Sequence, residues 1–423
     1  MPRSIGNTAL KAARQARGLS SQQALAAALH DAARQLGLGE IVVSRKQIGR
    51  WESPNPPWPR DDHQQLLTYV LRLPIEDLGF RAPWDDSVRP GPDGARPLTG
   101  RRPSAAHALP RPAAASSTQP PTVGADFAAV TEAHRRLYWS VPPATLHQAV
   151  AEHANLGAAL LAETDGIARR VLASALAESL LLAGRIQFFD LRQPEVADAT
   201  FVRALQAAGE ADDPLLGAAI LGHSAFVPGW AGHREDTAER MRAARTYARR
   251  GPASAELLAW LDAVEAECLT RCGDHRQALT ILRRAEETMS TGGEHRSPEW
   301  FTWFSSTRLA AFKGNTELAA GLVPQARTTL EAVLADLPET AGKQRVVVLG
   351  DLAAVEAAAR RPDAACALLE QALDQLGATW YATGMERIRE ARRALASWQD
   401  SDSVRRVDDR LYSWAAKLSS LQR

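Results

Sequence analysis

The feature of this sequence that most constrains its fold is an internal repeat in its second half. A small residue is followed four positions later by an apolar one, and three positions further by another small or apolar one. A period near 40 residues predicts helical hairpins that bury their apolar faces only by stacking on their neighbours. The five copies start 40, 41, 48 and 39 residues apart, at Ala197, Thr237, Ala278, Ala326 and Ala365.

Glycines support this division into hairpins. Gly232, Gly273 and Gly321 each stand five residues before a copy, where the chain is expected to turn between paired helices. The pattern resembles the tetratricopeptide repeat family over roughly residues 165–400, with longer repeats than the usual ~34 residues. The resemblance implies an α-solenoid. Abundant Ala, Leu, Arg and Glu, with few strand formers, predicts an all-α protein.

A proline-rich stretch divides the chain of 423 residues. Nine prolines fall between residues 82 and 122, with Gly, Ser and Ala between them and no apolar period. Such a segment cannot bury enough surface to offset its ordering entropy. We therefore expect an N-terminal domain over residues 1–81, a disordered linker over 82–124 and a helical repeat domain over 125–423.

The N-terminal domain is expected to consist of short helices. Asn7 can cap the first helix, and Gly18 can stop it. Ser20 or Ser21 can cap the second. Ser44 begins a third helix, "SRKQIGRW", and Asp61 begins a fourth. Residues 1–81 carry a net charge of +4, whereas residues 123–423 carry −5. A basic head on an acidic body is typical of a protein that binds a polyanion.

The third helix carries the chemistry of DNA recognition. Ile48 and Trp51 share one face and can pack on the first two helices. Polar and cationic side chains then face outward at Arg45, Lys46, Gln47 and Arg50. Arg and Lys suit guanine O6 and N7, and Gln suits adenine N6 and N7. Arg50, one turn further on, is better placed for phosphate.

Two segments in this order resemble the XRE family of helix-turn-helix regulators (lambda-repressor-like, Cro/CI). "GLSSQQALA" resembles its second helix, where a Ser-Gln pair, here Ser21 and Gln22, contacts backbone phosphate. "VSRKQIGRWE" resembles its recognition helix, which implies that Ser44, Arg45, Lys46, Gln47 and Arg50 face DNA. "HDAARQLGLGEIVV" contains about twelve residues more than the usual spacing and is expected to lengthen the second helix. With the linker and repeats, the chain is similar to actinobacterial XRE–tetratricopeptide regulators.

Other functional classes find little support. Three cysteines are too few for a disulfide framework, and no apolar leader or membrane span is evident, so a cytoplasmic location without membrane contact is expected. "GHSAF" at 222–226 is one residue short of a nucleophile elbow and is interpreted as a helix end before a "VPGW" turn. We expect no enzyme activity, no metal and no cofactor.

The richest aromatic patch is "EWFTWFSSTRLAAFKGN" at 299–315. Helical spacing would place Trp300, Trp303 and Phe304 on one face, as inter-repeat core or as the wall of a ligand groove with Arg308 as its anion anchor.

These observations together predict a sequence-specific transcriptional regulator that binds double-stranded DNA as a homodimer. The repeats would dimerise the protein, sense an effector, or do both, and the resemblance to XRE–tetratricopeptide regulators implies that such an effector would be a peptide or a small molecule. The alternative is a protein-interaction scaffold whose N-terminal helices bind a protein partner.

Overall fold

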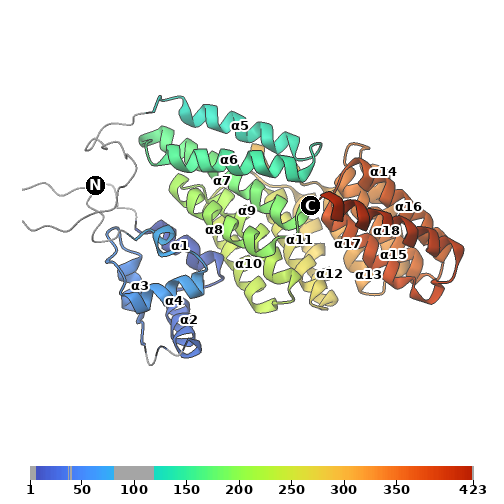
Figure 1. Ribbon diagram of the computed structural model, residues 1–423, viewed down its shortest axis with the longest axis horizontal. Helices are drawn as coiled ribbons and strands as arrows, with labels where there is room; N and C mark the ends of the chain where they lie inside the picture. Colours follow the sequence, from blue (N-terminus) through green and yellow to red (C-terminus); the bar gives the residue numbers. More distant parts are fainter. Residues whose placement is uncertain (1–5, 37, 39–40, 81–118, 422–423) are drawn as a thin grey trace, which may run out of the picture.

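The computed structural model describes residues 6–36, 38, 41–80 and 119–421, and within these ranges it is all-helical (Figure 1). The predicted linker at 82–124 lies almost entirely outside the described residues. The α-helices are α1 Thr8–Ala16, α2 Gln22–Gln35, α3 Arg45–Trp51, α4 Asp61–Leu71, α5 Val123–Leu137, α6 Pro143–Leu161, α7 Gly166–Arg185, α8 Pro194–Ala211, α9 Pro214–Trp230, α10 Arg234–Ala248, α11 Ala255–Arg271, α12 His275–Thr291, α13 Ser306–Ala319, α14 Val323–Asp336, α15 Gly342–Ala358, α16 Pro362–Ala378, α17 Ala382–Ala394 and α18 Asp402–Leu421. Short 3-10 turns η1 Ile75–Leu78, η3 Glu299–Phe301 and η4 Ala396–Trp398 and a π-helical turn η2 Ile186–Asp190 complete the order.

The repeat motif marks the second helix of each hairpin. The five copies lie in α8, α10, α12, α14 and α16, and each of these helices packs on the helix before it. No motif residue is more than 5% exposed. The buried positions, which confirm the predicted pattern, are Ala197, Phe201, Ala204, Thr237, Met241, Ala244, Ala278, Leu282, Ala285, Ala326, Leu330, Val333, Ala365, Leu369 and Ala372.

The turns inside these hairpins share one backbone conformation. Gly232, Gly273 and Gly321 have φ of +77°, +81° and +76°, as expected for chain reversals that glycine permits without strain. The equivalent position in the first and last hairpins is an arginine. Arg192 and Arg360 have φ of 58° and 59°. The left-handed turn therefore belongs to all five hairpins, including two that the glycine pattern did not mark.

The N-terminal head comprises α1 to α4 with η1. The predicted caps are confirmed: side-chain oxygens of Asn7, Ser21 and Ser44 accept hydrogen bonds from the N–H groups of Leu10 (3.1 Å), Ala24 (3.0 Å) and Gln47 (3.2 Å). Each cap satisfies one of the backbone donors that a helix start leaves free. The core of the head consists mainly of Leu10, Leu25, Leu29, Ile48, Trp51, Leu66, Leu67, Leu71 and Leu78.

The head packs against the helical body, as Figure 1 shows, and α1 lies on α8 and α10. Arg17 forms an ion pair with Asp198 at 2.6 Å. The Ser20 backbone N–H donates to Glu239 Oε1 at 2.7 Å, and the Tyr247 hydroxyl donates to Gln15 Oε1 at 2.6 Å. The buried apolar cluster of the head runs without interruption into that of the body. The sequence contains no signal for this interface.

Distant parts of the body also contact each other: η2, which lies between α7 and α8, contacts α15 and α17. The body is therefore closed. Lys343 of α15 pairs with Asp190 of η2 at 2.7 Å, and both side chains are almost fully buried. The Thr383 hydroxyl of α17 donates to the Phe189 carbonyl at 3.0 Å. The apolar segment Gly166–Asp190, which includes α7, is long and hydrophobic enough to cross a membrane, but 78% of its most apolar 18-residue window is buried inside the protein. Its apolar character is accounted for by the core.

Candidate functional site

Two regions of the structure have the character of binding sites, and the first is the outer face of α3. Ile48 is 0% exposed and Trp51 is 1% exposed. The Trp51 ring meets the edges of His63 and Phe80 at centroid distances of 5.3 and 6.3 Å. These contacts confirm that an apolar underside holds α3 on the head and fixes which side chains point to solvent.

The side chains on the opposite side of α3 are available to a partner. Ser44, Arg45, Lys46 and Arg50 are exposed, and Gln47 is partly exposed. Among the described residues, none of the three cations forms an ion pair or a side-chain hydrogen bond. We call Ser44, Arg45, Lys46, Gln47 and Arg50 the α3 surface. Directly before this surface, the Val43 side chain turns inward and is 5% exposed.

Gln22 lies beside this surface but already has an intramolecular partner. Its Nε2 donates to Glu52 Oε2 at 2.8 Å, and Glu52 Oε1 pairs with Arg14 at 2.6 Å. Gly49 faces it, since a Cβ on Gly49 would lie 3.7 Å from Gln22 Oε1. A primary amide carries two N–H groups, so Gln22 retains one donor for an anion.

The second region is a cavity of about 190 Å³ inside the closed body. It is lined by residues at the ends of α5 and α7 and by residues of η2, α9, α11, α13, α14, α15 and α17. Large aromatic side chains form much of the wall, among them Phe189, Phe226, Trp230, Trp260, Trp303 and Phe312.

Two arginines line this cavity without an acidic partner among the described residues. Arg185 lies over the rings of Tyr138 and Trp303, 5.0 Å from each centroid, and its buried Nε has no hydrogen-bond partner in the same part of the chain. Arg308 lies 4.8 Å from the Trp139 ring centroid and 5.3 Å from that of Trp303. Burial, and next the charge of Arg185, lower the pKa of Arg308 to about 10. We call Arg185 and Arg308 the arginine pair.

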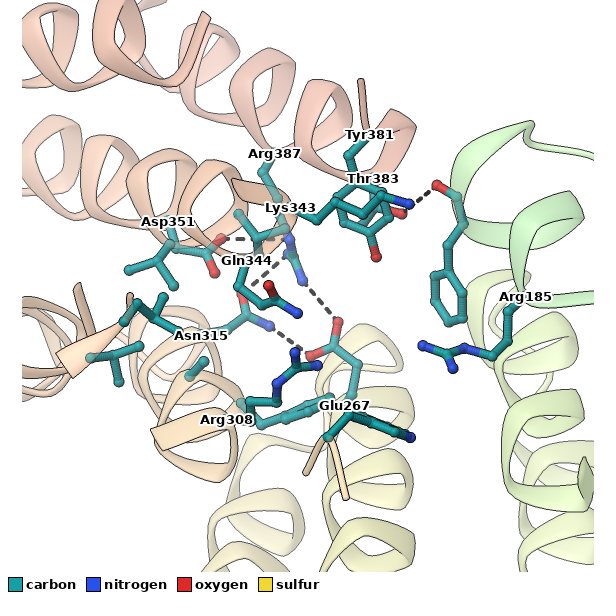
Figure 2. Close-up of a pocket in the computed structure, with 18 of the residues that line it drawn as sticks. Arg185, Glu267, Arg308, Asn315, Lys343, Gln344, Asp351, Tyr381, Thr383 and Arg387 are labelled. Atoms are coloured by element: carbon teal, nitrogen blue, oxygen red, sulfur yellow. Dashed lines mark hydrogen bonds and ion pairs between the residues drawn. The ribbon is translucent and has the colours of Figure 1, made fainter. Parts of the chain in front are cut away.

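The other cations of the cavity wall are neutralised. Lys343 is paired with Asp190, as described above, and lies 3.6 Å from the Tyr138 ring centroid. Arg387 binds Glu267 at 2.9 Å and lies 3.5 Å from Asp351, an arrangement visible in Figure 2. The Coulombic pull of the carboxylates of Asp351 and Glu267 outweighs burial and raises the pKa of Arg387.

The predicted groove residues divide between the cavity and its surroundings. Trp303 and Arg308 line the cavity, whereas Trp300 lines a smaller neighbouring pocket and Phe304 is buried. The predicted common helical face is wrong. Residues 299–301 form η3, and α13 begins only at Ser306, because the Ser305 side chain caps it. Trp303 therefore lies in a turn, and Phe304 lies in the non-helical segment before α13.

The "GHSAF" segment lies within a helix. α9 continues from Pro214 to Trp230 through Pro228, so the predicted helix end and "VPGW" turn are wrong. His223 Nδ1 lies 2.9 Å from the Ala219 carbonyl, and the Ser224 hydroxyl donates to the Leu221 carbonyl at 2.9 Å. Both side chains are thus engaged with their own helix, and burial lowers the pKa of His223 well below its usual value.

Most cavity residues were missed by the sequence analysis, although the repeat register contains a signal for some of them. Phe226, Glu267 and Asn315 each stand eleven residues before a repeat motif, and all three line the cavity. In these three hairpins the position lies on the first helix and faces the cavity. Arg185 precedes the π-helical turn η2, a local irregularity often found at functional sites.

Comparison with known proteins assigns no family to the chain. No family model matches it, and no curated protein matches it. Among solved structures, the chain is similar to the crystal structure of BtubC (BKLC) from P. vanneervenii, with 17% sequence identity and a TM-score of 0.40. The similarity covers 56% of this chain and 92% of that one. Similarity at this level supports no conclusion about function.

Proposed function

We propose that the protein is a sequence-specific, DNA-binding transcriptional regulator of the XRE type. In this proposal α2 and α3 form a helix-turn-helix, and the body is a tetratricopeptide-like solenoid that dimerises the protein and senses an effector. Arg45, Lys46 and Gln47 select bases, while Gln22, Ser44 and Arg50 contact the backbone.

One observation carries this proposal: the α3 surface presents three cations that have no partner in the described part of the chain, while Ile48 and Trp51 anchor the helix beneath it. A cation in an internal ion pair must break that pair to bind phosphate, which costs free energy. An exposed cation without such a pair can bind phosphate and release counterions from DNA without this cost. The polar side chains among them have the donors that base edges require.

Docking of the head on the body also supports the proposal. A dimer that reads two half-sites needs its reading heads at a fixed separation. Contacts of α1 with α8 and α10 hold the head in one orientation on the body, so body dimerisation would set that separation.

The test is a selection of random-sequence DNA duplexes by the purified full chain, followed by binding titrations of the enriched sequence by fluorescence anisotropy. Arg45→Ala with Lys46→Ala should weaken binding at least ~30-fold, since each base contact contributes about 1–3 kcal/mol. Affinity should also fall steeply between about 50 and 200 mM salt.

A matched control removes the same charge elsewhere. Arg276 and Arg283 are exposed residues of α12 that form no ion pair within the described part of the chain, so Arg276→Ala with Arg283→Ala should leave DNA affinity nearly unchanged. If no duplex binds at low salt, or if both double variants bind equally well, the regulator proposal fails. The alternative, a scaffold whose N-terminal helices bind a protein, would then be favoured.

A further inference from the structure

We propose that the central cavity is a binding site for a small organic acid that has a flat apolar body and one carboxylate or phosphate group. The arginine pair would hold the anionic group, and the aromatic wall would cover the body. This inference does not rest on the proposed DNA binding, and it is tested without DNA.

The first argument is that some cations of the cavity wall have carboxylate partners whereas others have none among the described residues. Lys343 and Arg387 each have carboxylate partners at 2.7 to 2.9 Å. The half-buried side chain of Arg185 forms no ion pair or hydrogen bond among the described residues, and its Nε is buried. An unpaired buried charge is costly, so such groups in proteins are normally paired or serve a function.

The second argument is the surroundings of Arg308. With its amide oxygen turned toward the guanidinium, Gln344 accepts hydrogen bonds from both terminal nitrogens of Arg308, the Nη1 at 2.9 Å. A neutral amide orients the guanidinium but leaves its charge in place. Both arginines stack on Trp303, so two like charges share one ring. An oxyanion between them would relieve their repulsion and bind in the planar, two-pronged manner that guanidinium groups favour.

The third argument concerns the body of the ligand. The cavity retains about 190 Å³ although several Trp and Phe side chains surround it, so it is far larger than the space for one water molecule. Figure 2 shows Arg185 reaching toward the space below Tyr381, with Arg308 and Gln344 on the facing side. Apolar walls with a few convergent polar groups are the usual form of a small-molecule site. The aromatic faces suit a flat ring system.

The experiment measures binding of 1-naphthoate, 1-naphthyl phosphate and the neutral 1-naphthalenemethanol to the full chain by isothermal titration calorimetry. These probes share one ring system and differ in the anionic group. We expect at least one acid to bind at least tenfold more tightly than the alcohol. Comparison of the two acids distinguishes a carboxylate ligand from a phosphate ligand.

Variants then locate the site. Arg185→Gln and Arg308→Gln should each weaken binding of the preferred acid at least tenfold and leave the alcohol unaffected. Arg276→Gln, on the exposed surface of α12, is the matched control and should bind like wild type. Circular dichroism and the Tm of each variant show whether it folds.

Three results would overturn the proposal. Neither acid binds the folded wild-type chain at millimolar concentration, the alcohol binds as tightly as the acids, or the arginine variants fold and bind as wild type does. If an arginine variant fails to fold, the comparison of the acids with the alcohol on the wild-type chain still shows whether the anionic group is required for binding. Failure of this test leaves the DNA-binding proposal untouched, because the α3 surface takes no part in it.

Discussion

The buried pair Asp190–Lys343 connects the first hairpin of the body to α15, across 153 residues of sequence. Its Oδ1–Nζ distance is 2.7 Å, and the side chains are 0% and 3% exposed. The Tyr138 hydroxyl is the second donor to Asp190, at 3.0 Å. Replacing Lys343 by Met keeps the length and apolar stem of the side chain but leaves the Asp190 carboxylate buried with a neutral donor alone.

The expected cost follows from this burial. Breaking a buried ion pair by removing one partner costs about 3–5 kcal/mol, since the remaining charge cannot be solvated. Removing both charges with Asp190→Asn and Lys343→Met should bring the free energy of unfolding back to within about 1.5 kcal/mol of wild type. Lys313 provides the matched control. It pairs with Glu286 at 2.8 Å, but both side chains are at least 30% exposed, so Lys313→Met should cost less than about 1 kcal/mol.

The assay is urea unfolding followed by circular dichroism, with hydrogen exchange of η2 and α15 as a local readout. Burial already raises the pKa of Asp190, and loss of Lys343 raises it further. A group whose folded-state pKa is raised contributes stability that is lost as pH rises through that pKa. The Lys343→Met variant should therefore be less destabilised at pH 5 than at pH 8. A loss below about 1 kcal/mol at pH 8, or no difference from Lys313→Met, would refute this account of how the body closes.

Three further predictions concern single positions. Arg360 is exposed at φ 59°, so Arg360→Gly should raise the urea midpoint by the equivalent of about 0.5–1 kcal/mol, whereas Gly273→Arg at the matching turn should lower it. Arg308→Gln should stabilise the ligand-free protein by about 1 kcal/mol in the same assay, because it removes a half-buried charge that has no ion-pair partner among the described residues; a fall in stability would indicate a structural role instead. Burial lowers the pKa of His153, which stacks on Phe127, to about 4, so the folded state binds fewer protons than the unfolded chain between pH 6.5 and 4. As the pH is lowered through that interval, the free energy of unfolding should fall by about 1.4 kcal/mol per unit of pKa difference between the folded and unfolded states. His153→Gln should reduce the slope of Tm against pH.

Much of the local structure was predictable because it depends on contacts close in sequence. The caps at Asn7, Ser21 and Ser44 form hydrogen bonds to N–H groups three residues ahead. The hairpin motif was visible because each hairpin buries the same three positions against its partner helix. Ile48 and Trp51 could be placed on the underside of α3 from their spacing alone, and both are buried.

The cavity was predictable only in part, for a different reason. Trp303 and Arg308 could be predicted as groove residues because aromatic residues cluster near them in sequence. Arg185, Lys343 and Tyr381 come from segments up to 196 residues apart and meet only because the body curves and closes. Even the predicted residues were placed on a continuous helix that does not exist before Ser306.

The sequence by itself therefore determined the all-helical character of the described chain, the caps at Asn7, Ser21 and Ser44, the five hairpins and the residues that α3 exposes. These follow from periodicity and from interactions within a few residues. Only the tertiary structure decided that α1 packs on α8, that η2 meets α15 and α17, and that one cavity is lined by two arginines with no ion pair among the described residues. These features depend on the sum of small rotations between successive hairpins and on side-chain pairs far apart in the chain. A residue pattern within one segment contains no information on these rotations or on these distant pairs.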